Sequence, residues 1–158
     1  QRHNSWVRNH SFETGKGRKS KKAVVFDLDG TLANTKDPNA HHKENHEGFR
    51  AHSRNADVFP EMVGKLREAK EEGMDVVILT ARSAHYRKDT KEWLNENNIP
   101  YDALYMRPVD DSRKDKKVKK ALLKEEILPD FDVKKAYDDK KKNVKMFRKE
   151  GINAKRVN

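Results

Sequence analysis

Two aspartates stand one residue apart directly after a short apolar run, and a Gly-Thr pair follows them. Residues 23–26 read Ala-Val-Val-Phe, and Asp27, Asp29, Gly30 and Thr31 come next. A short, wholly apolar run is typical of a strand buried on both faces. Strand alternation sends Asp27 and Asp29 to the same side of the strand end. Because like charges so close together repel, a divalent cation is their natural partner, and such carboxylates can carry out phosphoryl transfer.

Two further predicted strands end in polar side chains. Residues 74–79 lead into Thr80 and Arg82, and residues 133–137 lead into Asp138 and Asp139. In parallel sheets, ligands bind outside the carboxyl ends of the strands. We therefore expect these side chains to converge with Asp27 and Asp29 on a single site.

Each side chain at these strand ends has a predicted chemical role. Asp27 is the candidate nucleophile, which would form an aspartyl-phosphate. Asp29 is the candidate acid and base, which would protonate the leaving alcohol and then activate water. Asp138 would complete an oxygen site for Mg²⁺, with Asp139 as a second ligand or as a partner of its waters. Thr80 would bind phosphoryl oxygens through its hydroxyl.

A lysine is expected to neutralise the charge that builds up on the transferred phosphoryl group. Several lysines crowd residues 114–120. Val118 and Leu122 set the core face of the helix expected there, and Lys119 lies beside that face near the helix start. Lys119 is the favoured candidate, with Lys114 and Lys116 as alternatives.

The elements that position these residues alternate along the chain. Strands are predicted at residues 23–26, 74–79, 103–106, 133–137 and 152–157, and helices at residues 60–72, 86–98, 113–127 and 143–150. Such alternation indicates βαβ units with right-handed crossovers. The predicted fold is α/β: a three-layer, Rossmann-like parallel sheet with helices on both faces.

Residues 1–21 are polar and basic and are predicted to be a flexible arm or linker, so residues 22–158 form the predicted domain. Residues 33–56 lack a clean period and are predicted to be a loop or small flap. This segment holds four histidines, whose spacing fits no compact zinc-binding pair: His41, His42, His46 and His52.

The composition bounds the partners of the chain. The 158 residues carry a formal net charge of +10 and contain no cysteine. A basic excess of this size favours a polyanion such as nucleic acid, although part of it is ordinary solubilising surface. There is neither a membrane-length apolar run nor a signal-peptide pattern, so the predicted location is cytoplasmic. Because the chain begins at Gln1, a missing upstream domain stays open.

The order of the motifs resembles that of the haloacid dehalogenase (HAD) phosphohydrolases: DxDGT, a strand-end Thr, a Lys and an Asp-Asp pair. A narrower resemblance, over residues 22–157, is to the 3′-phosphatase domains of the polynucleotide kinase/phosphatases of T-even phages. It rests on residues 105–107 (Tyr-Met-Arg), the segment Asp-Ser-Arg-Lys-Asp at 111–115, Lys119 and the stretch 131–139.

The resemblance implies site residues and a cofactor. Asp27 and Asp29 would be the nucleophile and the acid/base, Thr80 and Lys119 would hold phosphate, and Arg82 and Arg107 would be substrate-side cations. The full predicted sets are catalytic Asp27, Asp29, Thr80 and Lys119; substrate-binding Arg82, Arg107, Lys114, Gly30 and Thr31; and Mg²⁺-binding Asp27, Asp29, Asp138 and Asp139. The chain departs from the phage pattern at Ala81, where the phage enzymes have Gly, at Thr80, where they have Ser, and at Lys140, where they have Arg.

The predicted reaction is Mg²⁺-dependent removal of the 3′-terminal phosphate from DNA or RNA through an aspartyl-phosphate. A small flap in place of a large cap suits a polynucleotide end. No kinase P-loop is present, so a kinase or ligase would be a partner or lie upstream. Two alternatives stay open: a HAD phosphatase that acts on free nucleotides or other small phosphomonoesters, and a basic nucleic-acid-binding module on a degenerate HAD scaffold. The intact aspartate set argues against the second.

Overall fold

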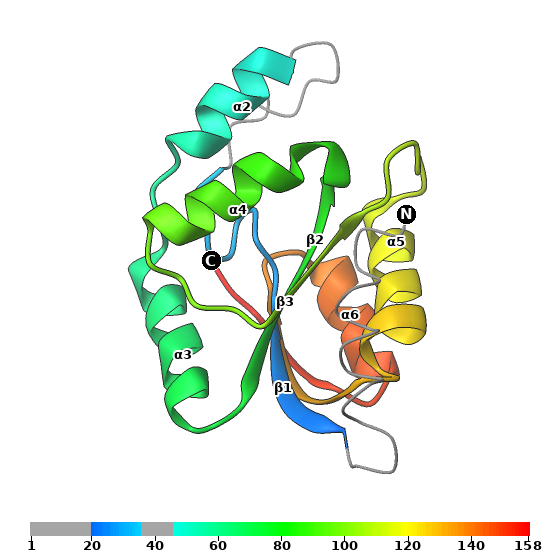
Figure 1. Cartoon of the computed structure of the whole chain (residues 1–158). Coiled ribbons are helices and arrows are strands. Elements are labelled where there is room, and N and C mark those ends of the chain that lie inside the picture. The colour runs from blue at the N-terminus through cyan, green and yellow to red at the C-terminus, as the bar shows by residue number, and fades with distance from the viewer. Residues whose placement is uncertain (1–19, 36–45) are drawn as a thin grey trace.

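Five parallel strands form the central sheet of the protein (Figure 1). The computed structural model describes residues 20–35 and 46–158. The strands are β1 (Lys21–Phe26), β2 (Asp75–Ser83), β3 (Ala103–Arg107), β4 (Phe131–Asp138) and β5 (Asn153–Arg156). Their order in the sheet is β3-β2-β1-β4-β5, and every neighbouring pair is parallel. The α/β prediction is confirmed.

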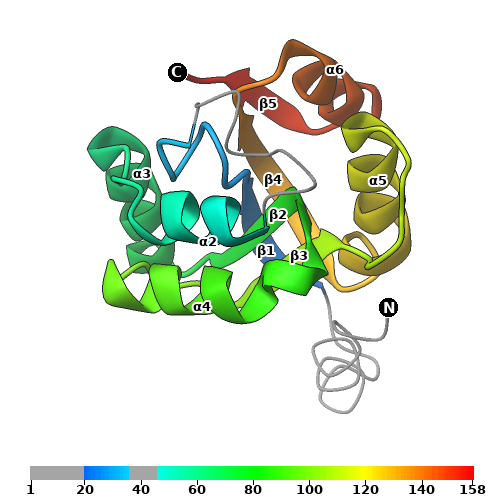
Figure 2. The same cartoon turned by 90° about the horizontal axis from the view of Figure 1, so that it is seen from above.

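Helices cover both faces of this sheet, as Figure 2 shows from above. Helices α3 (Pro60–Glu71) and α4 (Arg87–Glu96) lie on one face. Helices α5 (Asp115–Leu122) and α6 (Lys141–Lys149) lie on the other. A three-residue 3₁₀ turn, η1 (Ala84–Tyr86), joins β2 to α4, and a π-helical turn, η2 (Leu123–Ile127), extends α5.

The alternation of side chains along β1 divides the core into two layers. Val24 and Phe26 pack with Leu66 of α3 and Trp93 of α4. The intervening positions of the same strand face the other way, where Val25 packs among residues of α5 and α6. Because both faces are buried, the strand reads as a continuous apolar run, and its first polar residue marks the point where it leaves the core.

Part of the predicted flap is a helix. Residues 46–54 form α2 (His46–Arg54), which lies against α4 in Figures 1 and 2. Arg50 pairs with Asp89 at 3.1 Å, and Arg54 pairs with Glu92 at 2.7 Å. The prediction of an irregular segment was therefore wrong here. Phe49 is the one large apolar side chain of α2 that is buried, so the sequence has no helical period of apolar residues to reveal the helix.

Smaller differences affect element ends. Strand β2 continues beyond the predicted end at residue 79 to Ser83, with a register shift against β3 between Thr80 and Ser83. The predicted helix over 113–127 begins at Asp115 and changes to the π-helical turn after Leu122. Residues 1–19 of the predicted arm and the histidines at 41 and 42 lie outside the described residues. Within residues 20–35 and 46–158, no helix is long and apolar enough to cross a membrane.

Candidate active site

The first aspartate after β1 is buried at the carboxyl end of the sheet. Asp27 is 5% exposed, and its backbone N–H donates to the Tyr137 carbonyl of the neighbouring strand β4 at 3.0 Å. The Thr31 hydroxyl donates to Asp27 Oδ2 at 3.1 Å. Gly30 makes the turn between them with φ +87°, a conformation that L side chains rarely adopt. The DxDGT turn thus fixes the Asp27 carboxylate at the end of β1.

Lys119 bridges two carboxylates from different strands. Its Nζ donates to Asp27 Oδ1 at 2.7 Å and to Asp138 Oδ2 at 2.6 Å. The lysine is buried, whereas its neighbours Lys117 and Lys120 are exposed. Burial alone would lower the pKa of Lys119, but Asp27 and Asp138 outweigh it and raise that pKa. Lys119 therefore stays a cation at the centre of the site.

Asp138 and Asp139 complete a carboxylate cluster at the end of β4. Asp138 is 1% exposed, and its Oδ1 accepts from the Lys140 backbone N–H and from the Asn143 side chain. One oxygen from each of Asp27, Asp138 and Asp139 lies within 4.8 Å of the others. Asp139 Oδ1 is buried without a hydrogen-bond partner among the described residues.

The charges of the cluster do not balance. Burial raises the pKa of Asp27 well above its usual value, and the Asp138 charge raises it further, against the opposing effect of Lys119. When Asp27, Asp138 and Asp139 are all ionised, Lys119 leaves a net charge of −2. A divalent cation would balance that charge and fit the three-oxygen group, including the orphaned Asp139 oxygen.

The carboxylate of Asp29 points to other partners. Its Oδ1 accepts from Arg82 Nη2 and from the Thr35 hydroxyl, both at 2.6 Å, and its Oδ2 accepts from Arg82 Nε at 3.3 Å. Arg82 Nη1 donates to the Thr90 hydroxyl at 2.9 Å. The structure thus groups Asp29 with Arg82, whereas the sequence-based set placed it among the metal ligands.

Thr80 and Arg82 both come from the irregular end of β2. Thr80 is 1% exposed, and its hydroxyl accepts from the Arg82 backbone N–H at 3.0 Å. The register shift after Thr80 allows the strand to carry both side chains at the sheet edge. The ends of β1, β2 and β4 thus lie together at one end of the sheet, where hydrogen bonds join Asp29 to Arg82 and Lys119 to Asp27 and Asp138.

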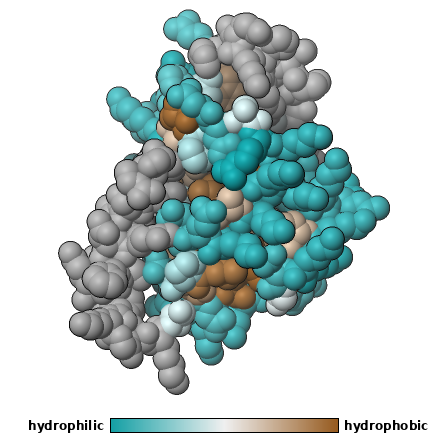
Figure 3. Space-filling model, turned by 90° about the vertical axis from the view of Figure 1, so that its right-hand side faces the viewer, coloured by the Kyte–Doolittle hydropathy of each residue, from teal (hydrophilic) through white to brown (hydrophobic). Residues whose placement is uncertain are grey.

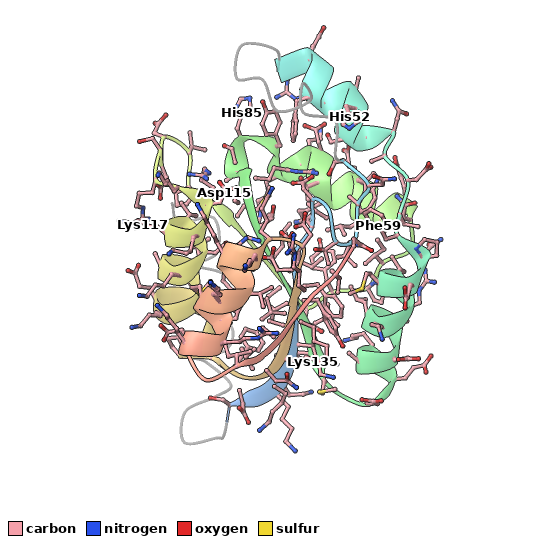
Figure 4. The ribbon with its side chains drawn as sticks, turned by 180° about the vertical axis from the view of Figure 1, so that it is seen from behind. His52, Phe59, His85, Asp115, Lys117 and Lys135 are labelled. Atoms are coloured by element: carbon pink, nitrogen blue, oxygen red, sulfur yellow. The ribbon has the colours of Figure 1, made fainter. Side chains whose placement is uncertain are left out.

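Two predicted substrate-binding residues stand at the two ends of the loop between β3 and α5: Arg107 is the last residue of β3, and Lys114 precedes α5. Arg107 donates to the carbonyls of Ala81, Asp111 and Arg113 and to Asp115 Oδ1. Four acceptors from three segments therefore bind the Arg107 guanidinium, which the sequence analysis predicted to bind substrate. Lys114, by contrast, is the exposed N-cap residue of α5. Figure 4 shows the start of this helix, labelled at Asp115 and Lys117, at the same end of the molecule as His85.

Several contributors were missed by sequence reasoning. Thr35, Thr90 and Asn143 each hydrogen-bond a predicted site residue, and Phe49 packs against Arg82. Only Asn143 carried a signal, because it stood at the predicted start of the last helix. Thr35 and Thr90 lie six and eight positions from their partners, in segments whose local structure carried no such signal, and Phe49 lies 33 positions from Arg82.

The chain is similar to a known family over nearly its whole length. Residues 21–158 match the family model described as the polynucleotide kinase PNKP phosphatase domain. The chain belongs to the PNKP phosphatase family. It is accordingly a HAD-type phosphatase that hydrolyses phosphomonoesters, as the resemblance predicted.

Solved structures agree with PNKP membership. A chain of the Pnkp1/Rnl/Hen1 complex is 34% identical with a TM-score of 0.76, over 89% of this chain and 47% of that one. A chain of the Pnkp1/Rnl/Hen1 RNA repair complex is 35% identical with the same TM-score, over 88% and 43%. The present chain thus spans less than half the length of these two relatives.

A more distant match supports the fold alone. The class C acid phosphatase from Bacillus anthracis is 17% identical with a TM-score of 0.59, and the match covers 89% of this chain and 64% of that one.

Proposed function

We propose that this chain is a Mg²⁺-dependent polynucleotide 3′-phosphatase that acts through an aspartyl-phosphate. The observation that carries the proposal is the buried Asp27 carboxylate, held between Lys119 and Thr31 at the edge where β1, β2 and β4 end. A carboxylate so placed is the nucleophile that a two-step phosphate transfer requires.

In the first step, an Asp27 oxygen bonds to phosphorus as the ester P–O bond breaks. Asp29 gives its proton to the departing alcohol oxygen, so the alcohol leaves neutral. Lys119 and the Thr80 hydroxyl would bind the equatorial phosphoryl oxygens, where negative charge gathers in the transition state. The pairing of Asp29 with Arg82 holds the acid at a fixed orientation.

In the second step, water attacks the phosphorus of the aspartyl-phosphate. Asp29, now ionised, accepts a proton from that water, and the bond to the Asp27 oxygen breaks. Inorganic phosphate leaves, and both aspartates return to their starting states. One carboxylate thus serves as acid and then as base, while the other forms and loses the covalent bond.

Mg²⁺ fits the residues present. Asp27, Asp138 and Asp139 offer three oxygens within 4.8 Å of one another, and hard oxygen donors suit Mg²⁺. When bound, the cation would offset phosphate charge and so allow a carboxylate to approach an anionic substrate. Asp29 takes no part in this group, because its oxygens bond to Arg82 and Thr35.

The distribution of charge supports a polyanionic substrate. Residues 60–102, which include α3 and α4, hold seven Lys and Arg against nine Asp and Glu. Residues 107–158, which include α5 and α6, hold eighteen against ten. Figure 3 shows the α5 side of the molecule, where the described surface is largely hydrophilic. The basic excess thus gathers on one side, which suits a strand of phosphodiesters.

Lysines at the start of α6 strengthen this argument. Lys140, Lys141 and Lys142 are exposed where β4 delivers Asp138 and Asp139 to the site, and the first turn of α6 contains no acidic residue. Cations are disfavoured at the positive N-terminal end of a helix, so helix stability does not account for them. Phosphate groups of a bound strand would offset that repulsion.

The relatives favour an end-repair setting. One matched structure is named as an RNA repair complex containing Pnkp1, Rnl and Hen1. By analogy we propose that this phosphatase acts on nucleic-acid ends together with a kinase or ligase.

The test is a comparison of phosphate release from three substrates: a 3′-phosphorylated oligonucleotide, the same oligonucleotide phosphorylated at the 5′ end, and nucleoside monophosphates. We expect the highest kcat/KM for the 3′-phosphorylated end. Preference for a mononucleotide would favour the small-substrate alternative. Binding of oligonucleotides without turnover of any phosphomonoester would favour the binding-module alternative.

A further inference from the structure

An aromatic ring from α2 covers the arginine that holds the acid–base carboxylate. Phe49 is 4% exposed, and its ring centroid lies 5.2 Å from the guanidinium carbon of Arg82. Arg82 is itself 7% exposed. The contact therefore joins the helix that the sequence did not predict to the end of β2.

The guanidinium of Arg82 is held on its edges by hydrogen bonds. It makes two to the Asp29 carboxylate and one to Thr90. These bonds hold the edges of the guanidinium, and its central carbon lies over the Phe49 ring. Because a cation over an aromatic face is attracted most strongly when water is excluded, the ring adds a restraint on Arg82 to those of the hydrogen bonds.

The ring is fixed in turn by its own surroundings. Phe49 packs on Tyr86 of η1, with ring centroids 4.5 Å apart. Arg50, the next residue, lies over the Tyr86 ring at 5.6 Å and pairs with Asp89 of α4. Helix α2 thus carries Phe49 to Arg82 on a support that does not include the carboxylate cluster of Asp27, Asp138 and Asp139.

We propose that Phe49 is a positioning residue for Asp29, acting through Arg82. The ring holds the guanidinium, and the guanidinium aims the carboxylate at the leaving oxygen of the substrate. The proposal rests on the role of Asp29 as acid and base in the proposed function. It assigns α2 a task in the reaction, because this helix then controls how well Asp29 transfers its proton.

The experiment compares two phosphate esters of similar size with different leaving groups. The benzyl alcohol of benzyl phosphate needs a proton to depart, whereas the 4-nitrophenolate of 4-nitrophenyl phosphate does not. The quantity measured is kcat/KM. It reports only the steps up to the departure of the leaving group, if that departure is irreversible. For Phe49→Leu we expect kcat/KM to fall about tenfold with benzyl phosphate and less than about twofold with 4-nitrophenyl phosphate.

Three further variants make the result decisive. Asp29→Asn should show the same leaving-group dependence more strongly, and Phe49→Tyr should restore the benzyl phosphate rate to within about twofold, because it keeps the ring. Phe131→Leu, a matched truncation of a buried ring at the start of β4, should affect both esters equally. Melting temperatures would show that all variants are folded.

The outcomes separate this inference from the proposed function. Equal losses with both esters in Phe49→Leu, beside a clear leaving-group dependence in Asp29→Asn, would overturn the positioning role alone. Equal losses in Asp29→Asn would refute the acid role itself and the inference built on it. A tenfold difference in Phe49→Leu that Phe49→Tyr reverses would establish the role.

Discussion

The Asp139 carboxylate fills the space in which a side chain on Gly30 would begin. A Cβ built on Gly30 overlaps Asp139 Oδ2, and the backbone of Gly30 has φ +87°. Two independent features therefore require glycine at this position of the DxDGT motif: its positive φ and the close approach of the Asp139 carboxylate that follows β4. This contact ties the turn after β1 to the cluster of Asp27, Asp138 and Asp139.

We predict that Gly30→Ala lowers turnover at least about tenfold, because Asp139 must move away from the cluster. The same variant should lose about 1–2 kcal/mol of unfolding free energy, because alanine is strained at the positive φ of this position. Urea denaturation and phosphate release would measure the two effects. Gly64→Ala in α3 is the matched control, since a Cβ there meets no atom within 4 Å. It should stabilise the helix by about 0.5–1 kcal/mol and leave turnover unchanged.

Lys119→Met removes the cation between Asp27 and Asp138. We expect turnover to be lost and, without added metal at neutral pH, the unfolding free energy to fall by about 3 kcal/mol, because two buried carboxylates are left facing each other. The adjacent exposed Lys120→Met serves as control and should change neither quantity substantially. A folded Lys119→Met protein with near wild-type turnover would remove Lys119 from the mechanism.

The same variant should have an altered pH dependence of stability. Burial and Asp138 already raise the pKa of Asp27, and loss of Lys119 takes away the charge that opposes them. A carboxyl whose pKa is higher in the folded than in the unfolded protein loses stability as the pH rises above the unfolded value. The stability gap between wild type and Lys119→Met should therefore be wider at pH 7 than at pH 5. A gap independent of pH would contradict a higher pKa of Asp27 in Lys119→Met than in the wild type.

Much of this site could be predicted from strand ends. Asp27, Thr80 and Asp138 each follow a predicted strand, and parallel strands must deliver such residues to one end of the sheet. Lys119 was selected from a crowded lysine run because Val118 and Leu122 fixed the core face of the helix. The structure buries Lys119 and leaves its lysine neighbours exposed.

The partners of these residues could not be predicted, because they depend on contacts between distant segments. Asp29 and Arg82 are 53 positions apart, and no local pattern says that they meet. Helix α2 forms through ion pairs with α4 and one buried ring, so it lacks the apolar period by which helices are found. Arg107 was assigned to substrate from the family resemblance. The carbonyls that accept its hydrogen bonds are backbone groups, which leave no trace in the sequence.

Removal of divalent cations should silence the enzyme, and Mg²⁺ should restore it. Asp138→Ala should weaken the apparent Mg²⁺ affinity more than Asp139→Ala, because Asp138 is held by Lys119, the Lys140 N–H and Asn143. Titration of activity with Mg²⁺ after EDTA treatment measures both. Full activity in EDTA, or a greater loss of affinity in Asp139→Ala, would argue against this arrangement.

Arg107→Ala should destabilise the protein by about 2 kcal/mol, because it leaves the hydrogen-bond acceptors of three segments without their donor. Turnover of small and polynucleotide substrates should fall in parallel, as the loop before α5 loosens. Arg113→Ala removes an exposed arginine from the same loop and is the matched control. A raised KM for oligonucleotides alone, at wild-type stability, would return Arg107 to the substrate-binding role predicted from the sequence.

The lysines at the start of α6 give the last prediction. Phosphate contacts by lysine release counterions, so KM for a 3′-phosphorylated oligonucleotide should rise steeply with salt, and KM for 4-nitrophenyl phosphate much less. The double change Lys141→Glu and Lys142→Glu should raise the oligonucleotide KM about tenfold at low salt and reduce its logarithmic salt slope by about 1–2.

Because acidic residues suit a helix N-terminus, this variant should be at least as stable as the wild type, which separates lost binding from lost folding. The control double change is Lys65→Glu and Lys91→Glu, which places the same charges on exposed positions of α3 and α4. Equal effects of the two double variants would mean that net charge alone governs binding. The strand would then have no defined path across the start of α6.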